Sequence, residues 1–124
     1  MSLFSDWLNA YGQAWETHDA ERIGRLFAED ALYYINPFAA PLRGRNDVIR
    51  YWQGIALKQR DVHFQAETLS ITGYTLLAHW TTTFQRVKSG KTIHLDGILL
   101  AEINPHQECI FFREWWHRQA MPFE

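Results

Sequence analysis

The stretch that decides the fold runs from Lys91 to Arg118 and reads KTIHLDGILLAEI (91–103), NPHQE (104–108) and CIFFREWWHR (109–118). β-Branched and aromatic residues, which favour extended backbone, dominate the first and third parts. The middle part holds Asn104 and Pro105, which are typical of turns. The stretch therefore predicts two long strands around one short turn, with charged residues set among large apolar ones.

Helical patterns come first in the chain. Apolar residues recur at three- and four-residue spacing over about residues 3–16, which predicts a helix capped by Ser2 or Ser5. A second, short helix is predicted to begin at Asp19 and to keep apolar residues on one face as far as Phe27.

Strand patterns dominate the chain after residue 30. The further predicted elements are a strand over 31–36, a loop over 38–44, a helix over about 47–57, strands over 62–71 and 74–87, and a hairpin turn over 88–91. Pro37 ends the first strand, and Asn46 or Asp47 is expected to cap the helix. Helices followed by a run of four strands indicate one α+β domain over residues 1–124, with an antiparallel sheet covered by helices on one face.

The composition excludes several classes of protein. The net charge of −2 and the lack of a basic run argue against nucleic acid or an anionic membrane as a partner. No apolar stretch is long enough to span a bilayer, and the N-terminal residues lack the pattern of a signal peptide, so we expect a cytoplasmic protein. One cysteine, Cys109, allows no internal disulfide and is expected to be a small core residue.

Several short motifs occur in a familiar order. They are Thr17-His18-Asp19, LFAEDA (26–31), Asn36-Pro37, LRGR (42–45), LDGI (95–98) and REWWH (113–117). In this order and spacing the chain resembles the nuclear transport factor 2-like superfamily, and within it the SnoaL-like and ketosteroid-isomerase-like proteins. The resemblance implies a cone, in which a strongly curved antiparallel sheet wraps around three helices and encloses a pocket. It also implies a homodimer formed through the outer face of the sheet.

The residues that ketosteroid isomerases use for catalysis are only partly present. Those enzymes combine a tyrosine and a protonated carboxylic acid as an oxyanion hole with an aspartate base. By resemblance, Tyr11 takes the place of the tyrosine, Asn36 that of the base and Leu99 that of the acid. Asparagine accepts no proton at neutral pH and leucine donates none, so true steroid isomerisation is not expected.

The first candidate for acid–base chemistry is the pair His94 and Asp96. The two residues are two positions apart on one predicted strand, so their side chains point to the same face. A carboxylate can orient a histidine that titrates near neutrality. The alternative is that this face is the outer one, with both side chains in water.

Glu114 is the second candidate. It shares its side of the last strand with Trp116, while Arg113 and Trp115 share the other side. Inside an aromatic pocket Glu114 would have a raised pKa and could act as an acid. The alternative is an ion pair with a nearby arginine at the rim of the sheet.

Aromatic residues from separate elements are expected to converge inside the cone. The candidates for ligand binding are Tyr11, Trp15, Tyr34, Asn36, Trp52, Trp80 and Trp115. Mostly apolar walls with a few polar groups suit a small hydrophobic molecule, although the same rings could fill a solid core. Three histidines of the predicted sheet, His63, His79 and His94, match no specific metal-binding spacing.

The sequence therefore supports two hypotheses for function. The first is a SnoaL-like pocket protein for a small hydrophobic molecule, which uses no cofactor and acts as a lyase, isomerase or cyclase by acid–base catalysis. The second is a module that binds a ligand or a protein without catalysis. No glycine-rich phosphate loop and no nucleophile elbow is present.

Overall fold

The computed structural model describes residues 2–119 and contains three helices and six strands within that range. The helices are α1 (Leu3–Glu16), α2 (Ala20–Arg25) and α3 (Arg45–Lys58). The strands are β1 (Phe27–Tyr34), β2 (Leu42–Arg43), β3 (Gln59–Thr72), β4 (Thr75–Arg86), β5 (Thr92–Ile103) and β6 (Cys109–Arg118). They form one sheet in the order β2-β1-β6-β5-β4-β3.

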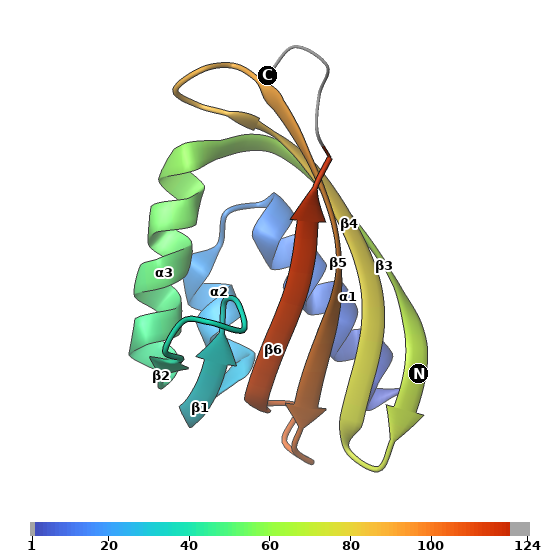
Figure 1. Ribbon diagram of the computed structural model, residues 1–124. Coiled ribbons are helices and arrows are strands. Elements are labelled where there is room, and N and C mark those ends of the chain that lie inside the picture. The colour runs from blue at the N-terminus through green and yellow to red at the C-terminus, as the bar shows by residue number, and fades with distance from the viewer. Residues whose placement is uncertain (1, 120–124) are drawn as a thin grey trace.

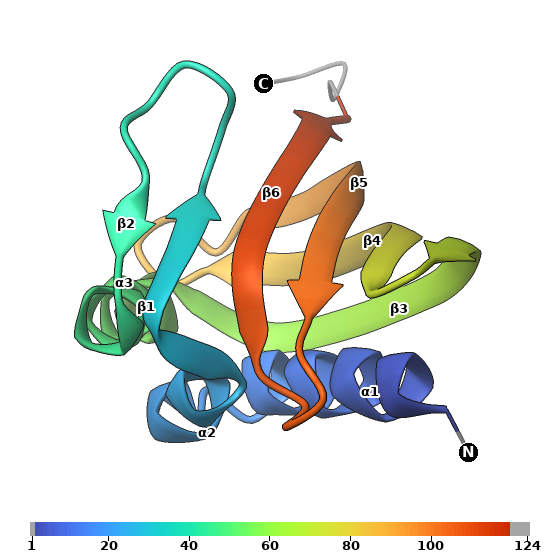
Figure 2. The same cartoon turned by 90° about the horizontal axis from the view of Figure 1, so that it is seen from below.

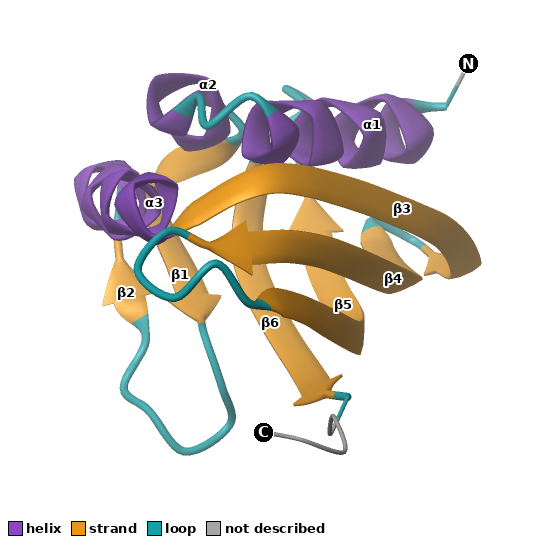
Figure 3. Ribbon diagram, turned by 90° about the horizontal axis from the view of Figure 1, so that it is seen from above, coloured by secondary structure: helices purple, strands orange, loops and turns teal. Residues whose placement is uncertain are grey.

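The sheet curves strongly, and all three helices lie on its concave side (Figures 1 and 3). Alternation of side chains explains how one face is buried. Along β4 and β5, every second residue from Leu76 to Phe84 and from Ile93 to Ile103 is buried. The inner face therefore carries the core, and the outer face carries the half-buried and exposed residues between them.

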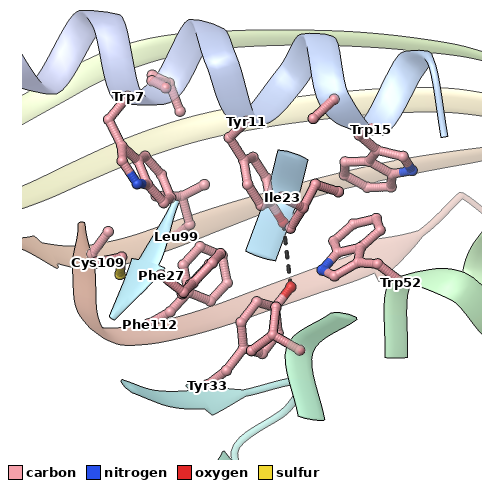
Figure 4. Close-up of a cluster of buried hydrophobic side chains, with 14 of the residues drawn as sticks. Trp7, Tyr11, Trp15, Ile23, Phe27, Tyr33, Trp52, Leu99, Cys109 and Phe112 are labelled. Carbon is pink, nitrogen blue, oxygen red and sulfur yellow. Dashed lines mark hydrogen bonds between the residues drawn. The ribbon is translucent and has the colours of Figure 1, made fainter. Parts of the chain in front are cut away.

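Aromatic side chains fill the closed part of the cone. Trp7, Tyr11 and Trp15 lie on one face of α1 and point toward the sheet, where Tyr11 packs against Phe112 with ring centroids 5.7 Å apart (Figure 4). Phe112 also stacks on Tyr33 at 4.4 Å. Burying each such ring stabilises the fold by about 2 kcal/mol or more, so this layer holds α1 on the sheet.

Three details differ from the sequence-based expectations. Phe27 begins β1 and does not extend the second helix, because the chain turns at Leu26, whose carbonyl accepts the backbone N–H of Cys109 at the start of β6. The predicted loop over 38–44 contains the short strand β2. Gly44 precedes α3 without a side-chain cap, and Asp47 instead accepts the backbone N–H of Arg43.

The sheet is also mixed, whereas a purely antiparallel one was expected. The strands β3 to β6 form an antiparallel meander, but β1 runs parallel to β6. The two are far apart in the sequence, so no hairpin dictates their relative direction. Beyond Tyr34 the chain leaves β6 and forms the long loop to β2 (Figure 2). Within residues 2–119, no helix is long and apolar enough to cross a membrane.

Candidate functional site

A cavity of about 420 Å³ opens between α3 and the inner face of the sheet. This volume lies in the range of small-molecule sites. Most of its wall is apolar or aromatic, and the residues that form this part include Trp15, Trp52, Trp80, Phe84, Ile93 and Leu95. Its uncharged polar lining includes Tyr51 and Gln59, and its acid is Glu114. The wall therefore combines apolar and aromatic surfaces with a few polar groups.

Glu114 projects into this cavity from β6. Its residue is 7% exposed, and it lies directly opposite the buried Leu99 of β5. No hydrogen bond or ion pair connects its carboxyl group to another residue in the described part of the chain. Burial away from water raises the pKa of Glu114 to about 8. At neutral pH its carboxyl group therefore carries a proton. The alternative considered for Glu114, an ion pair with a nearby arginine, is not formed within residues 2–119.

Three buried tyrosines lie close enough to Glu114 for its charge to affect their pKa values. Burial, followed by the charge of Glu114, raises the pKa values of Tyr11, Tyr33 and Tyr51. The hydroxyl oxygens of Tyr11 and Tyr33 are 3.3 Å apart, a contact shown by the dashed line in Figure 4. All three phenols stay protonated at neutral pH, so they offer hydrogen-bond donors and no negative charge.

Two indole groups of the wall have unused donors. Trp15 donates its Nε1–H to Gln59 Oε1 at 2.9 Å. The Nε1 atoms of Trp52 and Trp80 are buried and have no partner within the described residues. A buried donor without a partner costs about 1–3 kcal/mol, so these two groups lower the stability of the fold.

A second hollow of about 410 Å³ meets the first at Glu114 and Trp116. Asn36, Pro37 and Trp115 belong to its wall. The Asn36 side chain does not point freely into it, because Oδ1 accepts the backbone N–H groups of Phe38 and Ala39. The Asn36 side chain therefore stabilises the loop after β1. It does not supply a catalytic base.

His94 and Asp96 lie on the outer face of β5, and both are exposed. Asp96 Oδ1 is 2.9 Å from Nε2 of His79, whose Nδ1 is 3.2 Å from Glu67 Oε1. His94 instead contacts Gln119. The predicted His94–Asp96 pair is thus not brought together, and neither residue lines the cavity. The hydrogen bonds to Asp96 and then Glu67 raise the pKa of His79.

The ligand-binding candidates divide between four places. Trp15, Trp52 and Trp80 line the main cavity, and Trp115 lines the second hollow. Tyr11 is buried in the core above it. Tyr34 contacts Arg113, whose guanidinium carbon lies 4.7 Å from the centre of the Tyr34 ring. No group of three or more His, Cys, Asp or Glu side chains in residues 2–119 is arranged to hold a metal ion.

Several further residues of the site were not predicted from the sequence, among them Tyr33, Tyr51, Gln59 and Trp116. Trp116 carried a usable signal, because it has the same strand parity as Glu114. The two tyrosines had none, since their roles depend on the curvature of the sheet and the position of α3.

The family can be read from the sequence profile of a known domain. The profile of the SnoaL-like domain matches residues 8–106. The chain belongs to the SnoaL-like family. No curated protein matches this SnoaL-like chain.

Solved structures share the SnoaL-like fold at low sequence identity. A Bacillus subtilis protein, provisionally named an isomerase, has 15% identity and a TM-score of 0.82 over 94% of this chain and 90% of its own. The epoxide hydrolase/cyclase-like enzyme SalBIII, of pyran ring formation in the polyether salinomycin, has 14% identity and a TM-score of 0.80 over 91% and 89%. A computationally designed 17-OHP binder has 16% identity and a TM-score of 0.78 over 98% and 100%. These likenesses concern the fold.

Proposed function

We propose that this SnoaL-like protein is an enzyme that needs no cofactor and acts on a small hydrophobic molecule by proton transfer. The observation that carries the proposal is Glu114, a protonated carboxylic acid inside an apolar cavity. Enzymes use an acid of this kind when its pKa lies near the working pH, because it can then give up and regain a proton readily. The reaction classes that fit are isomerisation, elimination and ring closure.

The arrangement suits general acid catalysis at an oxygen of the ligand. Protonated Glu114 can donate to a carbonyl, epoxide or leaving-group oxygen held in the cavity. The hydroxyl group of Tyr51 can hold an acceptor atom of the same molecule. The conjugate base of Glu114 can then remove a proton elsewhere on the ligand, which restores the acid.

Steroid isomerisation in the manner of the ketosteroid isomerases is not part of the proposal. Asn36 occupies the place of the base and its side chain is committed to the loop. The neighbouring strand supplies an acid at nearly the missing position, because Glu114 lies opposite Leu99. The alternative function, binding without catalysis, would use the same cavity and would not need a titrating Glu114.

The test measures turnover of a panel of aromatic ketones, epoxides and esters by the wild type and by Glu114→Gln. Mass spectrometry detects the products. Glu114→Gln should lower turnover of any accepted compound by about 100-fold or more, since general acid catalysis contributes that much. Binding should change only a few fold, and the rate of the wild type should fall as pH rises through 8. Glu21→Gln, at an exposed position of α2 that does not line the cavity, is the control and should leave turnover unchanged. Equal turnover by wild type and Glu114→Gln would remove Glu114 from the mechanism, and binding without turnover by the wild type would favour the alternative.

We also propose that two copies associate through the outer face of the sheet. Ile98, Leu100 and Trp115 form an apolar strip on this face, and Trp115 is 40% exposed. Arg113 and Glu102 flank the strip, and a two-fold axis would let such opposite charges face each other.

A further inference from the structure

The wall of the main cavity changes from apolar to cationic as it approaches the solvent. On β4 the inner face continues from Phe84 to Arg86, and on β6 it continues from Trp116 to Arg118. Lys58 at the end of α3 faces the same opening. All three cations are exposed residues, so they lie at the rim of the cavity.

Two of these cations, Lys58 and Arg86, have no balancing carboxylate among the described residues. Glu114 is the one acidic residue that lines the cavity within residues 2–119, and it carries a proton at neutral pH. None of the ion pairs formed among these residues involves Lys58 or Arg86. The charges at the rim are therefore positive, while the interior is neutral.

The interior of the cavity is aromatic and neutral. Trp15, Trp52 and Trp80 belong to its wall, and Trp52 and Trp80 are 5% and 2% exposed. Flat aromatic walls favour stacking with a planar ligand. A ligand that satisfies both parts of the wall must combine a planar body with an anionic end.

We propose that the ligand is an amphipathic anion: a planar aromatic body in the cavity, with a carboxylate or sulfonate group held by Lys58 and Arg86 at the rim. This inference rests on the proposed function and narrows its substrate class. The acid Glu114 and the cations bind opposite ends of the molecule, so the cations fix which part of it lies beside Glu114.

Two fluorescent probes with the same aromatic body test the inference. One is 1-anilinonaphthalene-8-sulfonate, and the other is N-phenyl-1-naphthylamine, which lacks the sulfonate. Each is titrated into the wild type and the double variant Lys58→Met/Arg86→Met, with excitation of tryptophan so that energy transfer reports probes near the indoles of the cavity. The matched control, Lys88→Met/Lys91→Met, removes two exposed cations of the neighbouring hairpin turn that do not line the cavity.

The double variant should raise the Kd of the sulfonate about tenfold, since a partly exposed ion pair contributes a few fold in affinity for each cation. It should change the Kd of the neutral probe by less than about twofold, and the control should leave both probes unaffected. Added salt should weaken the sulfonate alone. Circular dichroism confirms folding, and the exposed positions make loss of folding unexpected.

Equal effects on both probes, or no effect on the sulfonate, would overturn the inference. The proposed function would survive that result if the neutral probe still bound the wild type in the cavity. The variant Ile55→Trp, whose larger side chain fills the cavity, should then no longer bind that probe. If neither probe bound the wild type, the cavity itself would not serve small aromatic ligands, and both proposals would fail.

Discussion

Glu114 differs from most buried carboxyl groups because no cation or backbone donor in the described residues stabilises its charge. A buried carboxylate without a partner costs several kcal/mol, and the protein avoids that cost by keeping the proton. The same feature that lowers stability at high pH supplies an acid at neutral pH. A destabilising group of this kind in a cavity indicates a function more strongly than it indicates a structural role.

Stability should reveal the proton on Glu114. In the folded protein its pKa is about 8, against an ordinary value of 4.5, so folding takes up a proton between these limits. Rising pH therefore opposes folding by up to about 1.4 kcal/mol per pH unit. Relative to Glu114→Gln, the wild type should be most stable below pH about 4.5 and should lose a few kcal/mol by pH 8. Urea unfolding across this range measures the difference; parallel curves would contradict the burial described for Glu114.

Tyr11 and Tyr33 should behave as a unit. The two hydroxyls are hydrogen-bonded to each other in the core, so Tyr11→Phe or Tyr33→Phe leaves one buried hydroxyl unpaired. Each single variant should lose about 1–2 kcal/mol, and the double variant should lose no more than either single one. A double-mutant cycle by chemical denaturation checks this, and additive losses would show that the hydroxyls act independently.

At the scale of the element, the sequence pattern predicted those helices and strands that local interactions determine. The helix over 3–16 and the strand over 109–118 agree with α1 and β6 because their apolar spacing is unambiguous. The end of α2 was misplaced, since Phe27 keeps helical spacing and only its pairing with Cys109 makes it a strand residue. Glu114 was placed on a strand with two alternative orientations, and only the curvature of the sheet decided which side faces the cavity.

Strand β5 contains a glycine that the packing requires. A Cβ at Gly97 would collide with the Trp115 carbonyl oxygen and the Trp80 ring. Gly97→Ala should therefore cost about 2 kcal/mol, in the range of overpacked cores. Gly54→Ala in α3 is the control, because a Cβ there meets nothing within 4 Å and should add up to about 1 kcal/mol of stability. Thermal unfolding of both variants measures the contrast, and equal shifts would contradict the close packing of β5 on β6.

At the scale of the molecule, the cone separates two surfaces with different tasks. The helices lie on the concave side of the sheet (Figure 3). That side holds the core and the cavity, while the convex side presents the apolar strip proposed to join two copies. The 15% of aromatic residues in the sequence predicted an aromatic interior, which could be a pocket wall or a solid core. The open end of the cavity and its cationic rim could not be predicted from the sequence. They depend on how α3, β4 and β6 are placed in space, which no local sequence pattern determines.

The proposed dimer makes a prediction of its own. Ile98→Arg places a charge in the middle of the apolar strip, so it should convert the dimer to a monomer without unfolding it. Gln85→Arg, near the end of β4 on the same face, should leave the dimer intact. Sedimentation velocity at micromolar concentration distinguishes the two species, and a monomeric wild type would remove the proposed interface.

The proposed general acid is tested most directly by the titration of Glu114 itself. Carbon-detected NMR on protein with labelled glutamate side chains follows each carboxyl carbon from pH 3 to 10, and Glu114→Gln assigns the resonance. We predict that the carboxyl group of Glu114 titrates near pH 8. A midpoint near 4.5 for Glu114 would show a solvated, ionised carboxylate at neutral pH, and the proposed general acid would be lost.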